Sequence, residues 1–193
     1  MTKHELLTQL KIFEGFRAYK YICPGGAETV GYGFTASQFP GGAIPNYMTK
    51  DEADLMLESL LDKWIEKVRN RLTSWGYLKC EIDVLLYPLT DFAYNCGLGN
   101  LDRLTNNGDR TVEMIAYKLP EYNKAGGNVL KGLTTRREWE KEEILKAINS
   151  TPAPYTIRDI QHTLNLYYNE SLKEDGIIGR KTIDAIMKVL YKG

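Results

Sequence analysis

Hydrophobic residues recur at helical spacing over most of the chain. Thr2 and Glu5 form a capping box ahead of an amphipathic segment that ends near Glu14, which predicts an N-terminal helix. A second capping box, Thr49 and Glu52, opens a long predicted helix. The apolar face of that helix carries Ala53, Leu57, Leu60, Leu61, Trp64, Ile65, Val68 and Leu72. An apolar stripe of this kind faces a core.

The segment 80–95 repeats the helical spacing, and we predict that it is the central buried helix of the main domain. Pro88 should kink this helix or split it in two. Further along, Thr111 is predicted to cap a short helix, and Thr135 with Glu138 forms a third capping box at the start of another helix. These segments predict a helical lobe.

Between the first two helices the pattern changes from helical to alternating. Residues 19–22 are rich in β-formers, residues 24–26 read Pro-Gly-Gly, and residues 29–33 alternate, so the stretch predicts a hairpin. A regular strand would place Thr29, Gly31 and Gly33 on one face and Glu28, Val30 and Tyr32 on the other. Residues 36–48 are rich in Gly and Pro and are predicted to be a loop. The fold class that follows is α+β and predominantly helical.

The clearest boundary in the chain is the stretch 150–154, Ser-Thr-Pro-Ala-Pro. Its two prolines cannot continue the preceding helix and stiffen a short linker. We therefore predict a main domain over residues 1–150 and a small helical domain over residues 155–193. At about forty residues the second domain lies near the lower limit for independent folding, so it either folds alone or packs on the first.

Composition narrows the class of protein. The 193 residues suffice for one domain with a sizeable core plus a small appendage. Lys and Arg total 25, as do Asp and Glu, so the chain lacks the basic excess of a nucleic-acid binder. Three scattered cysteines are too few for a disulfide framework or a zinc site, and they are consistent with synthesis in a reducing compartment.

No apolar run has the length of a signal peptide or a membrane span. We expect a monomer without metal or cofactor.

One short stretch gathers an acid, a thiol and a hydroxyl: Glu14, Cys23 and Thr29. We expect Glu14 at a helix end, facing a cleft with one apolar side. Burial disfavours the ionised form of a carboxyl group, and the raised pKa keeps a proton ready for general acid catalysis. The predicted hairpin should bring Cys23 and Thr29 back beside Glu14. Glu28 is a second carboxylate nearby, but on a regular strand it points to the opposite face.

The spacing Glu-x8-Cys-x5-Thr, followed by Gly-Tyr-Gly-Phe-Thr at 31–35, resembles the phage-type lysozymes, the muramidase endolysins of glycoside hydrolase family 24. The resemblance continues in Asp-Phe-Ala-Tyr-Asn-Cys-Gly at 91–97 and in Ala-Gly-Gly-Asn-Val-Leu-Lys-Gly-Leu at 125–133, which leads into Arg136 and Arg137. It covers roughly residues 5–148. Four motifs in the family's order make it specific, and it implies a phage-lysozyme-like domain with a small β lobe and a helical lobe.

The resemblance implies a role for each reactive group. Glu14 would donate the proton, and Thr29 would hold the attacking water. Cys23 stands where many relatives carry the Asp that activates this water. A thiol has a free pKa of about 8.5 and is mostly neutral at pH 7, so Cys23 would replace that base only in part.

Substrate contacts are expected at Gly31, Tyr32, Asn95, Gly97 and Arg137. Asn95 would hydrogen-bond an acetamido group, or else it caps the helix beside Gly97. In the family's arrangement one arginine, Arg136 or Arg137, pairs with the catalytic glutamate and holds its side chain in place. The alternative is that the two arginines form a solvated surface pair.

The same resemblance implies an endolysin that cleaves the β-1,4 bond between N-acetylmuramic acid and N-acetylglucosamine in bacterial peptidoglycan. It would stay in the host cytoplasm until a holin releases it to the cell wall. The C-terminal segment is similar to the helical type of peptidoglycan-binding domain, whose signature is matched by Asp175, Gly176, Gly179 and Thr182. A helical hairpin that only stabilises the protein is the alternative for this segment.

Three rival functions stay open. A lytic transglycosylase would use the same Glu14 but give an anhydro product. A noncatalytic wall-binding or virion protein would need neither Glu14 nor Thr29 at these positions. A chitinase-like enzyme fits less well, because the C-terminal signature indicates peptidoglycan.

Overall fold

The computed structural model describes residues 1–23, 25–150 and 157–191. The chain divides into two compact units, Met1–Ile148 and Asn149–Gly193. Of the predicted linker 150–154, only Ser150 is described, as the last residue of a helix, and the rest lies outside the described residues.

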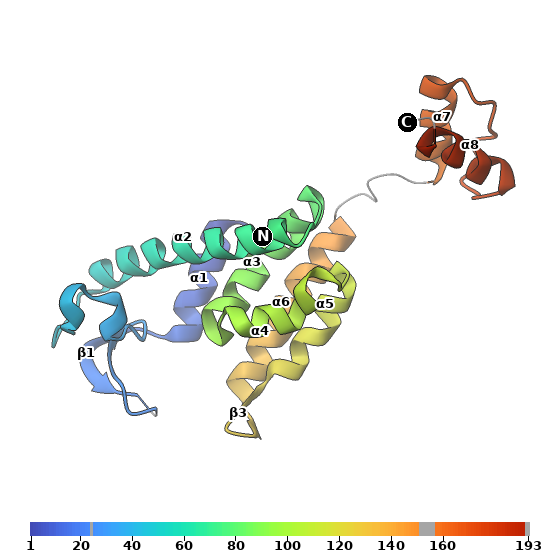
Figure 1. Ribbon diagram of the computed structural model, residues 1–193. Coiled ribbons are helices and arrows are strands. Elements are labelled where there is room, and N and C mark those ends of the chain that lie inside the picture. The colour runs from blue at the N-terminus through green and yellow to red at the C-terminus, as the bar shows by residue number, and fades with distance from the viewer. Residues whose placement is uncertain (24, 151–156, 192–193) are drawn as a thin grey trace. The chain divides into compact units, whose positions relative to one another are not determined.

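The first unit is mostly helical, with two small antiparallel sheets (Figure 1), so the predicted α+β class is confirmed. Its helices are α1 (Lys3–Glu14), α2 (Lys50–Ser74), α3 (Lys79–Cys96), α4 (Leu98–Thr105), α5 (Val112–Lys118) and α6 (Lys131–Ser150). Its strands are β1 (Arg17–Ile22), β2 (Glu28–Gly31), β3 (Lys124–Ala125) and β4 (Asn128–Val129). Short 3-10 turns occur at Ala36–Gln38, Pro40–Gly42, Asn106–Gly108 and Leu119–Tyr122.

Three of the predicted helix caps are confirmed. Thr2 and Glu5 form a reciprocal capping box at α1, and Thr49 and Glu52 form another at α2. The hydroxyl of Thr111 accepts a hydrogen bond from a backbone N–H of α5. Each cap satisfies N–H groups that the helix itself leaves unpaired.

The third predicted capping box is wrong. Thr135 lies inside α6, and its hydroxyl donates to the carbonyl of Lys131 at 3.1 Å. The helix begins at Lys131, with one residue between it and the end of the β3–β4 hairpin. A threonine inside a helix can donate its hydroxyl to the carbonyl four residues earlier, and this is the role of Thr135 in place of the predicted cap.

Helix α3 forms the centre of the helical lobe, as predicted. Its apolar residues pack in one buried cluster with residues of α2, α4, α5 and α6. The helix continues through Pro88, which is itself buried, so the proline does not split it. A second buried cluster joins α1, the start of α2 and the β lobe, and it includes Leu6, Leu10, Val30, Tyr32, Phe34, Leu57 and Leu61.

The predicted hairpin is confirmed, but its second strand is shorter than expected. β1 and β2 pair antiparallel with Tyr21 opposite Thr29. β2 ends at Gly31, whose φ is +65°, and the chain turns so that the N–H and C=O of Val30 bond those of Phe34 at 3.1 and 2.9 Å. The predicted alternation through Gly33 is therefore wrong, because a positive φ reverses the chain where a strand would continue.

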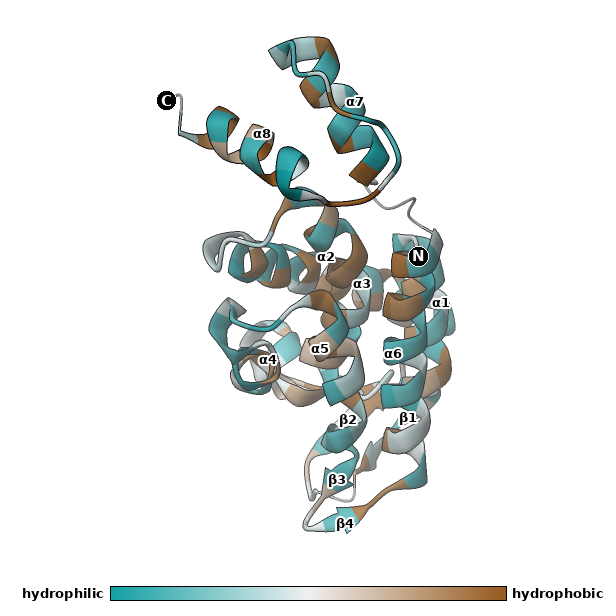
Figure 2. Cartoon of the chain, turned by 90° about the vertical axis from the view of Figure 1, so that its right-hand side faces the viewer, coloured by the Kyte–Doolittle hydropathy of each residue, from teal (hydrophilic) through white to brown (hydrophobic). Residues whose placement is uncertain are grey.

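The second unit contains α7 (Ile157–Tyr168) and α8 (Arg180–Leu190). Both helices are amphipathic. In Figure 2 each of them carries both hydrophilic and hydrophobic residues. The buried amide of Gln161 donates to Asp175 at 3.1 Å and to Thr182 at 3.2 Å, so one side chain ties both ends of the Asp-Gly-x-x-Gly-x-x-Thr motif to α7. Within the described residues, no helix combines the length and the apolar character that crossing a bilayer needs.

Candidate active site

Glu14 is the last residue of α1, as predicted. Gly15 ends the helix with φ +66°, and its N–H donates to the carbonyl of Lys11 at 3.1 Å. The Glu14 side chain keeps 22% of its surface exposed and lines a cavity of about 740 Å³. The apolar residues Ile12, Phe13, Leu130 and Leu133 are part of its lining. The carboxyl group of Glu14 therefore lies at a cavity that is lined in part by apolar side chains.

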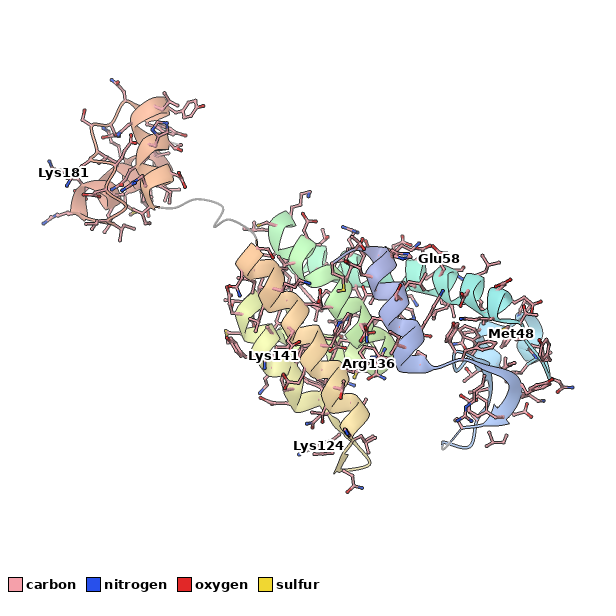
Figure 3. The ribbon with its side chains drawn as sticks, turned by 180° about the vertical axis from the view of Figure 1, so that it is seen from behind. Met48, Glu58, Lys124, Arg136, Lys141 and Lys181 are labelled. Atoms are coloured by element: carbon pink, nitrogen blue, oxygen red, sulfur yellow. The ribbon has the colours of Figure 1, made fainter. Side chains whose placement is uncertain are left out.

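Arg136 holds the Glu14 side chain and also lines the cavity. Its Nη1 donates to Oε1 of Glu14 at 2.8 Å, while Nε and Nη2 donate to the two oxygens of Asp91 at 2.7 and 3.0 Å. The side chain of Arg136 is 5% exposed and that of Asp91 is fully buried. In Figure 3 Arg136 lies on α6 where that helix faces α1. A bidentate ion pair of this kind fixes both the position and the orientation of the guanidinium group.

The charge of Arg136 is secured by its partners. Burial alone would favour the neutral form, but the carboxylates of Asp91 and Glu14 outweigh it and raise the pKa of Arg136. The guanidinium carbon also lies 5.0 Å from the ring centroid of Phe13, and this ring packs edge-on against Trp139. Arg136 is therefore a fixed cation behind the exposed acid.

The expectation for Arg137 is corrected. Arg137 is fully buried and does not line the cavity. Its Nη2 donates to Oε1 of Glu140 at 2.5 Å, and its Nη1 contacts Sγ of Cys96 at 2.8 Å. Consecutive helical residues point about 100° apart, so Arg136 and Arg137 cannot both face Glu14. Nor are the two arginines a solvated pair, since both are buried.

Asn95 and Gly97 take different positions at the end of α3. Asn95 is exposed and lines the cavity together with Glu14. Gly97 is the residue that ends the helix: its φ is +80°, and its N–H donates to the carbonyl of Ala93 at 2.8 Å. The structure therefore separates the two alternatives, with Asn95 at the cavity and Gly97 as the cap.

The reactive groups of the hairpin are not among the residues that line this cavity. Cys23 is half-buried beside the turn. Thr29 is only 3% exposed, and its hydroxyl donates to the carbonyl of Tyr21 at 3.4 Å. Glu28 is exposed and pairs with Lys20 at 3.1 Å. The cavity thus brings together Glu14, Asn95 and Arg136, and the structure does not add the predicted thiol and hydroxyl to them.

The expectation for Gly31 and Tyr32 as substrate contacts is also corrected. Tyr32 is 2% exposed, and its hydroxyl donates to Oδ1 of Asp54 at 2.7 Å. Burial and the contact with Asp54 raise the pKa of Tyr32 to about 12. A Cβ at Gly31 would lie 2.8 Å from the ring of Phe34, so the glycine makes room for that ring and not for a ligand. Both residues belong to the core of the β lobe.

Sequence reasoning missed Asp91, although it lies in the motif at 91–97. A signal was available, because an acid within an apolar helical run is seldom buried without a partner. That partner is 45 residues away in the sequence, and the pattern of α3 alone does not name it.

Comparison with known proteins relates the chain to the phage lysozymes and endolysins. The family description "Phage lysozyme" matches residues 11–140. An endolysin of Bacillus phage B103 is 30% identical over 139 residues, which cover 68% of this chain and 49% of that protein. A SAR-endolysin of Enterobacteria phage PA-2 is 34% identical over 138 residues, which cover 68% of this chain and 77% of that protein. The chain spans about half the length of its relatives in the Bacillus phages B103 and PZA.

Solved structures share the fold. The active form of the P1 phage endolysin Lyz has a TM-score of 0.58 at 20% identity, covering 77% of this chain and 87% of that one. The muramidase domain of SpmX from Asticaccaulis excentricus has a TM-score of 0.53 at 26% identity, covering 73% and 95%. The family match extends over more than half of the chain and includes both Glu14 and Arg136. The chain therefore belongs to the phage lysozyme family.

Proposed function

We propose that the protein is an endolysin that hydrolyses the β-1,4 glycosidic bond between N-acetylmuramic acid and N-acetylglucosamine in bacterial peptidoglycan. One observation carries the proposal: Glu14 is a part-exposed carboxyl group on a cavity with several apolar lining residues, and it is paired with the buried guanidinium of Arg136. Membership of the phage lysozyme family supports the same reaction class. Release from the host cytoplasm by a holin stays a prediction from the family resemblance.

Glycoside hydrolysis requires a proton donor at the leaving oxygen. We assign this role to Glu14. Arg136 bonds Oε1, so we place the transferable proton on Oε2. As the bond breaks, the leaving sugar takes this proton, positive charge develops on the other sugar, and water adds there. Asn95, on the same cavity, is positioned to bond an acetamido group.

The water-activating side of the reaction rests on the sequence spacing that relates Cys23 and Thr29 to Glu14. The burial of Thr29 counts against a direct contact with substrate. Glu14 is also the one carboxylic acid that lines the cavity within the described chain. This observation favours a second candidate, a lytic transglycosylase, in which a hydroxyl of the muramic acid attacks in place of water and no base for water is needed.

Glu14→Gln tests the shared part of both candidates. The substitution keeps the shape of the side chain and removes the acidic proton, so clearing of a cell-wall suspension should stop while the circular dichroism spectrum is unchanged. Glu28→Gln is the matched control, because Glu28 is exposed and pairs only at the surface. If the Glu14→Gln variant still lyses cell walls, Glu14 is not the proton donor. Mass spectrometry of the wild-type digest separates the candidates, because an anhydro product is one water lighter.

For the C-terminal unit we propose binding to peptidoglycan. The Asp-Gly-x-x-Gly-x-x-Thr match supports it, as does a cavity of about 260 Å³ beside that motif, lined in part by Asp175, Arg180 and Thr182. The inactive Glu14→Gln chain should sediment with purified cell walls, and the same variant ended at residue 150 should sediment less. Equal sedimentation would reduce this unit to a stabilising role.

A further inference from the structure

Behind Arg136, two carboxyl groups meet in the interior of the first unit. Asp91 on α3 and Glu140 on α6 are both completely buried, and a side-chain hydrogen bond to Asp91 is among the causes that raise the pKa of Glu140. Two ionised carboxylates cannot form such a bond, because their oxygens only accept. A bond between these two carboxyl groups therefore requires a proton on one of them.

The hydrogen bonds around this pair indicate which residue holds the proton. Asp91 accepts from Arg136 through both oxygens, at 2.7 and 3.0 Å. Glu140 accepts from Arg137 through Oε1 only. Its second oxygen, Oε2, is buried and has no hydrogen-bond partner among the described residues if it is unprotonated. A proton on Oε2 turns this unsatisfied acceptor into a donor to Asp91.

The charged groups around Glu140 lead to the same assignment. Burial and the negative charge of Asp91 raise the pKa of Glu140 well above its ordinary value, against the opposing effect of Arg137 and Arg136. Arg136 already pairs with two acids, Asp91 and Glu14, and Arg137 pairs with Glu140. Three acids therefore share two guanidinium groups, and the cluster would carry one excess negative charge if all three were ionised.

We propose that Glu140 is a neutral carboxylic acid that donates to Asp91 and so acts as a positioning residue for Glu14. The chain of contacts runs from Glu140 to Asp91, from Asp91 to Arg136 and from Arg136 to Oε1 of Glu14. A fixed donor keeps both oxygens of Asp91 turned toward Arg136, and Arg136 then keeps one orientation toward the cavity. The consequence for activity rests on the proposed function, whereas the location of the proton does not.

The location of the proton is tested on the intact wild-type chain, with carbon-13 at the glutamate side-chain carboxyls. The Glu140 resonance is identified by its absence in Glu140→Gln, and Glu142→Gln, at an exposed position of the same helix, is the matched control. At about pH 6 ordinary glutamates are ionised, so Glu140 should stand apart with the shift of a protonated acid. An ionised shift for Glu140 at that pH would overturn the proposal.

The positioning role is tested by comparing two substitutions of similar size. Gln keeps an N–H donor for Asp91 and an oxygen for Arg137, whereas Met keeps neither. Glu140→Gln should retain kcat within about twofold, and Glu140→Met should lose about tenfold or more in kcat at nearly unchanged KM. Equal losses in the two variants, or no loss in either, would refute the role.

Failure of the proposed function has a different signature. A wild-type chain that leaves cell walls intact would refute the proposed hydrolysis, yet its carboxyl titration would still locate the proton. If Glu140→Met does not fold, the wild-type titration together with the activity of Glu140→Gln still decides the proposal.

Discussion

Asp91→Asn is the sharpest perturbation of the candidate site, because it replaces one oxygen by an amide group and leaves the shape of the side chain intact. In the structure the two oxygens of Asp91 accept from Nε and Nη2 of Arg136 at 2.7 and 3.0 Å, and the Asp91 side chain is fully buried. An asparagine offers one oxygen and one NH2 group. The NH2 group would face a guanidinium N–H, so one bond is lost and two donors oppose each other.

The expected loss of stability is large for a single atom. Removing one partner of a buried ion pair costs about 3–5 kcal/mol. Arg136 keeps Glu14 as a second partner, so we expect the lower end, about 3 kcal/mol. At roughly 2–4 °C per kcal/mol for a chain of this size, Tm should fall by about 6–12 °C.

Activity should fall as well. Once Asp91 no longer fixes the guanidinium, Glu14 is held at one point by a mobile cation, and misplacement of a catalytic group by about 1 Å can cost about a hundredfold in rate. The assays are thermal unfolding by circular dichroism and clearing of cell walls at a temperature where the variant stays folded.

Asp83→Asn is the matched control for this prediction. Asp83 lies on the same helix, but its ion pair with Lys79 is exposed, and such pairs contribute about 0.3–0.5 kcal/mol. If Asp91→Asn shifts Tm no more than Asp83→Asn and lyses walls at the wild-type rate, the reasoning about the buried pair is wrong.

Two further predictions concern other parts of the fold. Gly31→Ala should destabilise the protein more than Gly33→Ala, because both positions have positive φ but only the Cβ at Gly31 would meet Phe34, at 2.8 Å. For Gly33→Ala we expect a loss of about 1 kcal/mol in the free energy of unfolding, from φ alone. Urea unfolding measures both losses, and equal losses would contradict this reasoning. In the second unit, the backbone N–H of Ile177 and the amide of Gln161 lower the pKa of Asp175, so its contribution is present above the unfolded pKa and is lost as the pH falls through the folded pKa. Amide protection factors in α7 and α8, which are corrected for the intrinsic exchange rate at each pH, should therefore fall in acid in the wild type, and Asp175→Asn should lack this acid-dependent loss.

Local sequence determined the features that depend on neighbouring residues. The capping boxes at Thr2 and Thr49, the cap at Thr111 and the hairpin turn after Cys23 need only side chains and backbone within a few positions. The place of Glu14 at a helix end follows in the same way, since the apolar spacing stops there and Gly15 follows. These features could be predicted because the interactions that stabilise them join residues only a few positions apart in the sequence.

Only the tertiary structure decided which groups meet at the cavity. Arg136 and Arg137 are adjacent in sequence, yet one faces Glu14 across 122 positions and the other faces the interior. Asp91 became part of the site only when α3 packed against α6, and Gly31 proved to accommodate the ring of Phe34. The physical reason is that the rotation and packing of each helix are fixed by burial against the other helices. The spacing of apolar residues within one helix carries no information about the surface of the helix that packs against it.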